Sequence, residues 1–219
     1  MLTDPEESRI IANARQKNVA DPNRSREHFL RIFEDFLHEV DFRDKVLLDL
    51  GPGQYDFAEL SRKRGAITHG IDNDPWVVKL GEYKKLPARL GNLKKLKASD
   101  YDVQFDGVFC KYSINAFWFY PVEQALVNYI REIVRLIKPG GWAWIAPWNG
   151  VPTKAKISRE GVDRVLSVQA MAFKGAGFSA VDLTESLSRY YGVHGRTGNR
   201  ALFFLNLPRP DRLKNCRDL

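Results

Sequence analysis

The pattern of hydrophobic and polar positions changes its period near residue 42. Before that point, apolar residues recur every three or four positions over 6–16 and again over 29–40, which predicts two helices. Beyond it, short apolar runs alternate with helical segments, as is typical of a sheet whose strands are joined by helices. We therefore predict an N-terminal helical cap over residues 1–42 and a domain of strands and helices over residues 43–219.

The alternating part of the chain supplies seven strand candidates. They lie at 45–50, 66–72, 87–91, 105–111, 141–147, 178–187 and 200–207. The helical segments between them lie near 54–64, 75–85, 121–137 and 158–175. This alternation predicts an α/β fold, with a mostly parallel sheet covered by helices on both faces. The last two strands are predicted to form an antiparallel pair across the loop over residues 192–199.

Composition narrows the class of protein. The chain has 219 residues, enough for one sizeable core, and 44% of them are hydrophobic. We find no apolar run long enough to span a membrane, and the N-terminal residues do not resemble a signal peptide. With two cysteines, Cys110 and Cys216, neither a disulfide framework nor a zinc cluster is expected, so the cytoplasm is the expected compartment. The net charge of +7 favours anionic partners without identifying one.

The first strand runs into a glycine turn, "VLLDLGPGQYDF", over residues 46–57. In open α/β sheets, ligands bind beyond the carboxyl ends of the strands, so this turn is the expected ligand site. A nicotinamide or flavin dinucleotide site would need a third glycine, and Asp56 stands there instead. A P-loop is excluded because no Gly-Lys-Ser/Thr follows. The turn fits a ligand that approaches the backbone closely and is not anionic at that point.

Five motifs along the chain resemble those of the class I S-adenosylmethionine-dependent methyltransferases. In order they are "LLDLGPG", "THGIDNDP", "LGNLKKL", "FDGVFCKYSINAF" and "YIREIVRLIKPGGWAWI", and they lie between residues 43 and 149. The resemblance implies a Rossmann-like, seven-stranded, mostly parallel sheet with strand order 3-2-1-4-5-7-6. It also implies S-adenosylmethionine as the cofactor and S-adenosylhomocysteine as its product. A sulfonium cation tolerates nearby carboxylates that would repel a pyrophosphate.

The resemblance also implies individual residues of the cofactor site. Asp72 would accept hydrogen bonds from the ribose hydroxyls, and Leu93 would pack on the adenine ring. Tyr55 stands where the family commonly has a small residue, so it would narrow the methionine end of the pocket or place its hydroxyl on the cofactor carboxylate. The expected cofactor-binding residues are Asp49, Gly51, Gly53, Tyr55, Asp72, Asn73, Asn92, Leu93 and Lys111.

The acceptor site is expected on the loop after the fourth strand, "CKYSINAFWFYP". Its polar groups would orient an acceptor, while its aromatic run would stack the acceptor, exclude water or pack in the core. A histidine in the loop "YYGVHGRTGNR" is a candidate general base. No metal is expected, because the carboxylates of a metal-dependent mechanism do not follow the fourth strand. The expected catalytic residues are Tyr112 and His194, and the expected substrate contacts are Asn115, Phe117, Trp118, Tyr120, Trp148 and Asn149.

Taken together, the motifs predict methyl transfer from S-adenosylmethionine to a hydroxyl or an amine of a small or medium acceptor, such as a sugar, another metabolite or a natural product. Residues 79–97 hold seven basic residues against one acid, which suits an anionic acceptor or a solvated face. One alternative is a nucleic-acid methyltransferase, for which no recognised binding module is appended. The other is a partner protein that keeps the fold without turnover.

Overall fold

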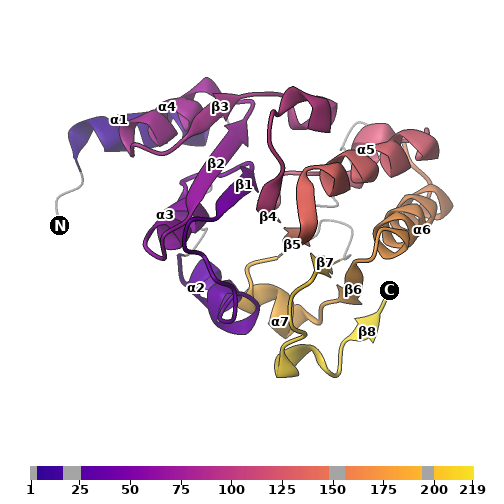
Figure 1. Ribbon diagram of the computed structural model, residues 1–219. Helices are drawn as coiled ribbons and strands as arrows, with labels where there is room; N and C mark the ends of the chain where they lie inside the picture. The colour runs from indigo at the N-terminus through magenta and orange to yellow at the C-terminus, as the bar shows by residue number, and fades with distance from the viewer. Residues whose placement is uncertain (1–3, 17–25, 148–155, 194–199) are drawn as a thin grey trace.

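The computed structural model describes residues 4–16, 26–147, 156–193 and 200–219, and it shows one sheet between layers of helices (Figure 1). The strands are β1 Val46–Leu50, β2 Ile67–Asp72, β3 Ala88–Leu90, β4 Phe105–Lys111, β5 Ile137–Ala146, β6 Ser179–Asp182, β7 Ala201–Leu205 and β8 Arg217–Asp218. Their order in the sheet is β3-β2-β1-β4-β5-β7-β6-β8. Neighbours from β3 to β5 are parallel, whereas β7 runs antiparallel to β5 and β6, and β8 runs antiparallel to β6.

Helices cover both faces of the sheet. They are α1 Pro5–Gln16, α2 Arg26–Asp35, α3 Asp56–Arg62, α4 Pro75–Tyr83, α5 Glu123–Arg135, α6 Arg159–Gly175 and α7 Glu185–Tyr190. Short 3-10 turns lie in the loops, namely η1 Leu93–Lys95, η2 Ala98–Asp100, η3 Ala116–Phe119 and η4 Asp211–Leu213. Side-chain caps begin several of the helices, as where Ser158 accepts the Gly161 N–H at 3.1 Å before α6.

The predicted α/β fold is confirmed, including the strand order 3-2-1-4-5-7-6 and the antiparallel last pair. The C-terminal residues add β8, a short edge strand that the sequence pattern did not predict. The prediction of one strand over 178–187 is wrong in its second half, because β6 ends at Asp182 and α7 follows. Thr184 Oγ1 accepts the Leu187 N–H at 3.4 Å and so begins this helix.

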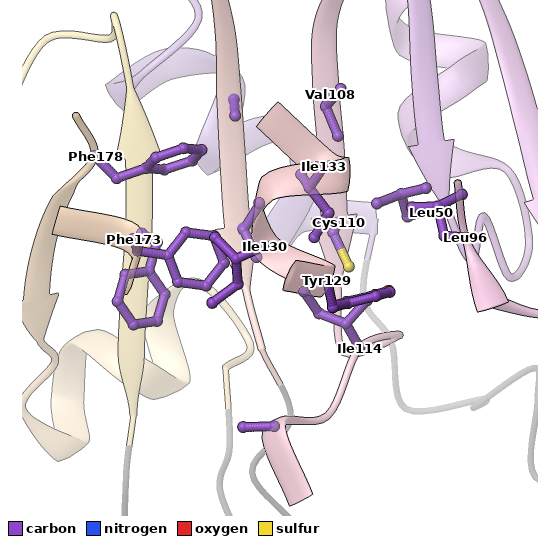
Figure 2. Packing of buried hydrophobic residues seen from close by; sticks show 14 of the residues in the cluster. Leu50, Leu96, Val108, Cys110, Ile114, Tyr129, Ile130, Ile133, Phe173 and Phe178 are labelled. Carbon is purple, nitrogen blue, oxygen red and sulfur yellow. The ribbon is translucent and has the colours of Figure 1, made fainter. Parts of the chain in front are cut away.

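Alternate residues of the strands face two different cores. Leu48 faces the core beneath α5 and α6, part of which Figure 2 shows. Leu47 faces the opposite core, beneath α2 and α3. In that second core the rings of Phe57, Phe109 and Trp144 stack in series, with centroids 4.0 Å and 5.1 Å apart. Aromatic stacking thus fixes α3 on β4 and β5, directly behind the glycine turn.

Both N-terminal helices pack on the sheet domain. Ile10 and Ala14 of α1 are fully buried in a cluster with Leu80 of α4. Ile32 of α2 is fully buried in the aromatic core. These helices share their hydrophobic cores with the rest of the chain, so packing does not mark a boundary at residue 42. The predicted domain boundary stays a prediction. Within the described ranges, no helix has the length and apolar character needed to cross a membrane.

Candidate functional site

The glycine turn after β1 is held by a residue from the loop after β4. Gly51 and Gly53 have φ of 78° and 56°, a region that glycine enters without strain. A Cβ at Gly51 would lie 1.9 Å from Ser113 Oγ, so a side chain has no room there. Ser113 Oγ donates a hydrogen bond to the Gly51 carbonyl oxygen at 3.1 Å. The sequence pattern did not single out Ser113, although a small hydroxyl just past a strand that neighbours β1 was a usable signal.

Buried carboxylates lie on β1 and β2 near this turn. Asp49 and Asp72 have 2% and 6% of their surface exposed. One Asp72 oxygen accepts the Asp74 N–H at 3.0 Å, and Asp74 in turn caps α4 by accepting the Trp76 N–H at 2.8 Å. Asn73, between the two acids, is exposed. The structure therefore holds Asp72 at the carboxyl end of β2, in a position suited to accept hydrogen bonds from hydroxyl groups.

The turn after β3 forms an apolar wall beside the glycine turn. Asn92 Oδ1 accepts the Lys94 N–H at 3.0 Å and so begins η1. Leu93 is buried, and its Cδ1 lies 3.6 Å from the position that a Cβ on Gly51 would take. The fold thus brings Leu93 against the turn, where its side chain can pack on a flat ring.

The side chain of Tyr55 points into the core and not toward a ligand at the turn. Its exposure is 0%, and its ring and hydroxyl lie 2.8 Å and 2.5 Å from where Cβ atoms on Gly70 and Gly81 would be. These glycines make room for the ring between β2 and α4. The expected contact of the Tyr55 hydroxyl with a cofactor carboxylate stays a prediction, and this buried position does not support it. Burial raises the pKa of this hydroxyl, and the charges of Asp49 and Asp72 raise it further.

Strand β4 ends in a buried positive charge. Lys111 has 2% of its surface exposed, and its Nζ lies 4.9 Å from the ring centroids of both Phe29 and Tyr112. An ammonium group over aromatic faces is favourable. Burial raises the pKa of the nearby Asp56 carboxyl, the first residue of α3, while positive charges that include Arg26 and Lys111 oppose the rise. Lys111 therefore acts electrostatically on the start of α3, directly after the glycine turn.

Tyr112 holds the chain at Gly192, close to the end of the described range 156–193. Its backbone has φ of 70°, and its hydroxyl donates a hydrogen bond to the Gly192 carbonyl oxygen. A Cβ at Gly192 would lie 2.2 Å from His28 Nδ1, so α2 packs closely on the same point. The structure thus places Tyr112 at the carboxyl end of β4, where an acceptor was expected, and gives its hydroxyl a positioning bond. The other expected residues of this side, His194, Trp148 and Asn149, lie outside the described residues.

The aromatic run after Asn115 packs mainly toward α5. Asn115 Oδ1 accepts the Phe117 N–H at 2.9 Å, which begins η3. Phe117 has 4% of its surface exposed and belongs to the core, and packing in the core was one of the alternatives expected for this aromatic run. The Trp118 ring centroid lies 6.4 Å from that of Tyr129 on α5, while Tyr120 is 43% exposed. Acceptor contacts by Asn115, Trp118 and Tyr120 stay predictions.

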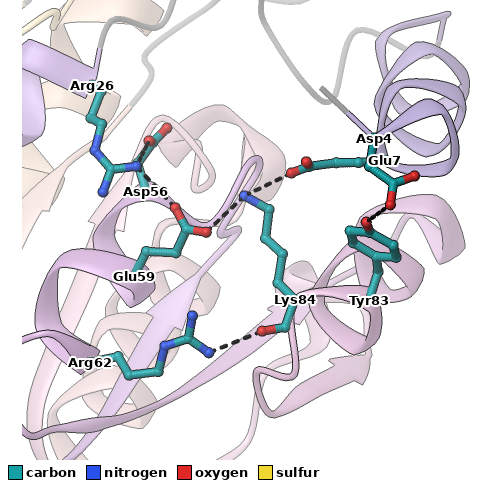
Figure 3. A network of polar contacts seen from close by, with 8 residues as sticks. All are labelled: Asp4, Glu7, Arg26, Asp56, Glu59, Arg62, Tyr83 and Lys84. Carbon is teal, nitrogen blue, oxygen red and sulfur yellow. Dashed lines mark hydrogen bonds and ion pairs between the residues drawn. The ribbon is translucent and has the colours of Figure 1, made fainter. Parts of the chain in front are cut away.

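A network of charged side chains borders the start of α3 (Figure 3). Arg26 lies 3.0 Å from Glu59 and 3.6 Å from Asp56. Lys84 lies 3.1 Å from Glu59 and 3.4 Å from Glu7, so the network also joins α1 to the end of α4. Burial raises the pKa of the Glu59 carboxyl, but hydrogen bonds and charges from Lys84 and Arg26 outweigh it and hold the pKa below its ordinary value of 4.5. Among the described residues, no group of three His, Cys, Asp or Glu side chains could hold a metal ion.

Comparison with known proteins agrees with this geometry. Residues 48–145 match the family described as Methyltransferase domain. Residues 48–145 are therefore similar to a methyltransferase domain, and the chain has the Rossmann-like methyltransferase fold. The match covers β1 to β5 and so includes the glycine turn, Asp72 and Lys111. No curated protein matches the sequence.

Solved structures resemble the chain over most of its length. A TehB-like SAM-dependent methyltransferase from Corynebacterium glutamicum is 18% identical, with a TM-score of 0.53 over 92% of this chain and 99% of its own. The sugar N-methyltransferase KedS8 from Streptoalloteichus sp. is 16% identical, with a TM-score of 0.53 over 90% of this chain and 91% of its own. The cyclase SpnF is 15% identical, with a TM-score of 0.54 over 93% of this chain and 94% of its own. At these identities the likeness shows the fold alone.

S-adenosylmethionine is the cofactor that the methyltransferase domain implies, and the site fits it. Leu93 supplies an apolar wall beside the glycine turn, and Asp72 supplies a buried acceptor for hydroxyl groups. Carboxylates are compatible with a cationic sulfonium. When bound, the cofactor supplies an electrophilic methyl group. The residues of the chain would bind it, orient an acceptor and exclude water.

Proposed function

We propose that this methyltransferase moves a methyl group from S-adenosylmethionine to a hydroxyl or an amine of a small or medium acceptor, such as a sugar, another metabolite or a natural product. The observation that carries the proposal is the junction of two loops at the carboxyl edge. Ser113, from the loop after β4, lies directly on the glycine turn. A cofactor on the turn and an acceptor on this loop would therefore be neighbours.

In the proposed reaction the chain acts mainly by alignment. Displacement at the methyl group needs the acceptor atom in line with the leaving sulfur, and fixed geometry supplies large effective molarities. A neutral amine needs little help from a base, whereas a hydroxyl needs one. We assign orientation of the acceptor to Tyr112, and removal of its proton to His194. Lys111 is proposed as a cofactor contact, because its buried charge lies beside the start of α3.

Cofactor binding is tested first, by calorimetric titration with S-adenosylhomocysteine and with NAD as the comparison ligand. We expect the adenosine ligand to bind and NAD to give no heat. Asp72→Ala should weaken binding by about 1–3 kcal/mol, roughly ten- to a hundredfold, through the lost ribose hydrogen bonds. The matched control is Asp106→Ala, whose carboxylate binds the Val46 N–H and Lys138 at the opposite edge of the sheet. Unchanged affinity in Asp72→Ala would remove Asp72 from the site.

Turnover is tested separately, because SpnF carries the same fold and is described as a cyclase. The protein is incubated with S-adenosylmethionine labelled in its methyl group and with a panel of amino sugars, phenols and sugar phosphates. We expect the native protein to transfer the label to an acceptor and the Asp72→Ala variant to lose this transfer. Tight cofactor binding with no label transferred to any acceptor class would contradict methyl transfer to small acceptors and favour a partner without turnover. KedS8, a sugar N-methyltransferase of the same fold, makes amino sugars the first panel to try.

A further inference from the structure

The basic residues of positions 79–97 divide into two groups in the structure. Lys84, in the first group, forms ion pairs with Glu7 and Glu59 and so links α1, α3 and the end of α4. Lysines of the second group are exposed, and within the described ranges none of them forms an ion pair with a carboxylate. This second group consists of Lys94, Lys95 and Lys97. The basic run is therefore not one solvated face, and its second group has charges that the fold itself does not use.

These three lysines surround a hollow between the η1–η2 segment and α5. Its volume is about 640 Å³, within the range of roughly 300–1,000 Å³ that is usual for small-ligand sites. Arg135, in the last turn of α5, adds a fourth positive charge. Among the described residues that line the hollow, the acid is Glu132, and it accepts hydrogen bonds from Arg135 at 2.5 Å and from the Ala98 N–H at 2.9 Å. The rim is therefore positive overall.

The floor of the hollow is apolar and rests on the core. Its members are Leu96, Ala98, Phe119, Ala125 and Tyr129. Phe119 is half-buried, and its ring centroid lies 5.0 Å from that of Tyr129. Tyr129 lies beside Cys110 and Ile114 in the core beneath α5 (Figure 2). This backing fixes the Phe119 ring, so the wall is preformed and does not have to be ordered on binding.

A positive rim over an aromatic wall favours a ligand that carries both a negative charge and a flat ring. Phosphate groups bind clustered lysines and arginines, and flat rings stack on aromatic side chains. We infer that the hollow binds a nucleotide, with its base against Phe119 and its phosphate among Lys94, Lys95, Lys97 and Arg135. The nucleotide is either free or part of a single strand, because both present the same base and phosphate.

This nucleotide site is separate from the glycine turn. The residues that line the hollow include none of the expected cofactor contacts, although Leu93 directly precedes Lys94 and η3, which ends at Phe119, begins directly after Asn115. A ligand in the hollow would therefore sit beside the cofactor site without occupying it. It would anchor a molecule next to the methyl-transfer centre.

The test is a calorimetric titration with uridine monophosphate while S-adenosylhomocysteine saturates the cofactor site, at 50 mM salt. Uridine and inorganic phosphate are titrated as the two halves of the ligand, and each should bind at least about tenfold more weakly than the nucleotide. The double variant Lys95→Glu/Lys97→Glu should lose at least about tenfold in affinity for the nucleotide. Lys63→Glu, which makes the same kind of charge change at an exposed residue after α3, is the matched control and should change nothing.

The aromatic wall has its own variant, Phe119→Leu, which keeps an apolar side chain and removes the ring. This variant should weaken the binding of the nucleotide and of uridine and leave the binding of inorganic phosphate unchanged. Equal binding of inorganic phosphate and nucleotide, or unchanged binding in the double lysine variant, would overturn the inference. So would the absence of any uridine monophosphate binding at 50 mM salt.

A single-stranded oligouridylate separates the two sources of the nucleotide. If the hollow takes free nucleotides, the strand should bind no more tightly than the monophosphate. If it takes a strand, the strand should bind more tightly and its affinity should fall steeply between 50 and 200 mM salt. Binding of S-adenosylhomocysteine is recorded alone in every variant, so failure of the cofactor site and failure of the nucleotide site are read independently.

Discussion

The two sides of the carboxyl edge of the sheet are built in different ways. On the side of β1, β2 and β3, short-range bonds set the site, as where Asp72 accepts the N–H of Asp74, two residues further on. On the side of β4, β5 and β7, the bonds join distant segments, and Tyr112 donates to Gly192 across 80 positions. The comparison teaches that the expected cofactor side combines local bonds with a long-range bond from Ser113 to Gly51, whereas the expected acceptor side relies mainly on contacts between distant segments.

The largest expected effect is on the cofactor side, at Gly51. Gly51→Ala adds a Cβ at φ of 78° and at 1.9 Å from Ser113 Oγ. We expect the free energy of unfolding to fall by about 2–4 kcal/mol, because backbone strain and displacement of Ser113 add together. Affinity for S-adenosylhomocysteine should fall at least about a hundredfold, since the turn can no longer keep its shape. Urea denaturation and calorimetry measure the two effects.

Gly140→Ala is the matched control for this change. Gly140 has φ of 75°, nearly that of Gly51, but nothing lies within 4 Å of an added Cβ. It should therefore lose about 1 kcal/mol of unfolding free energy through backbone strain alone, and none of its cofactor affinity. Equal losses in the two variants would mean that the contact with Ser113 adds nothing.

A smaller and more selective effect is expected on the acceptor side. Tyr112→Phe removes the hydrogen bond to the Gly192 carbonyl and should lower the free energy of unfolding by about 0.5–1.5 kcal/mol. Turnover should fall about tenfold or more, because the acceptor loop is no longer held, while cofactor affinity stays within about twofold. Equal loss of turnover and cofactor affinity would contradict the separation of the two sides. An unchanged pH profile of the remaining activity would mark Tyr112 as a positioning residue, not a proton donor or acceptor.

The smallest effect is expected from the charged network behind the glycine turn. The pKa of Glu59 lies below its ordinary value of 4.5, so its contribution to stability is present above that pH and is lost as the pH falls through the lowered pKa. Glu59→Gln should therefore be about 0.5–1 kcal/mol less stable than the native protein at pH 7, allowing for solvent screening. The difference should shrink as the pH falls below about 4.5. The contribution of Asp56 does not cancel fully in this comparison, because the charge of Glu59 is one of the causes that raise the pKa of the Asp56 carboxyl.

Cofactor affinity at pH 7 is the second reading for Glu59→Gln. It should be unchanged, because Glu59 ties α3 to α4 and does not reach the turn. A loss as large as that in Gly51→Ala would show that the network, and not the turn alone, shapes the cofactor side.

The cofactor side could be predicted from the sequence because its signals are local. Glycines after an apolar strand and an acid at the end of the next strand each indicate their own conformation, and the resemblance placed Asn92 after the third strand. Their order along the chain also predicted the strand order, since each motif belongs to one strand of a known topology. Gly51, Asp72 and Asn92 all occupy the places that these signals indicated.

The rest depended on contacts between distant residues. The direction of Tyr55 is set by the room at Gly70 and Gly81, which no pattern around residue 55 reveals. Helix α7 was hidden because its cap, Thr184, lies inside a stretch of mixed apolar and polar residues that we interpreted as one strand. The division of the basic residues over 79–97 likewise follows from tertiary contacts. Lys84 pairs with Glu7, whereas Lys94 lines the hollow beside α5.

The bond from Ser113 to the Gly51 carbonyl also bears on how the protein is made. Strand β1 leaves the ribosome well before its neighbour β4, because 62 positions separate the two bonded residues. During that interval β2 can pair with β1, but the turn lacks the hydroxyl that fixes its shape. We therefore expect the glycine turn to take its final shape only after Ser113 has been synthesised and β4 has paired with β1.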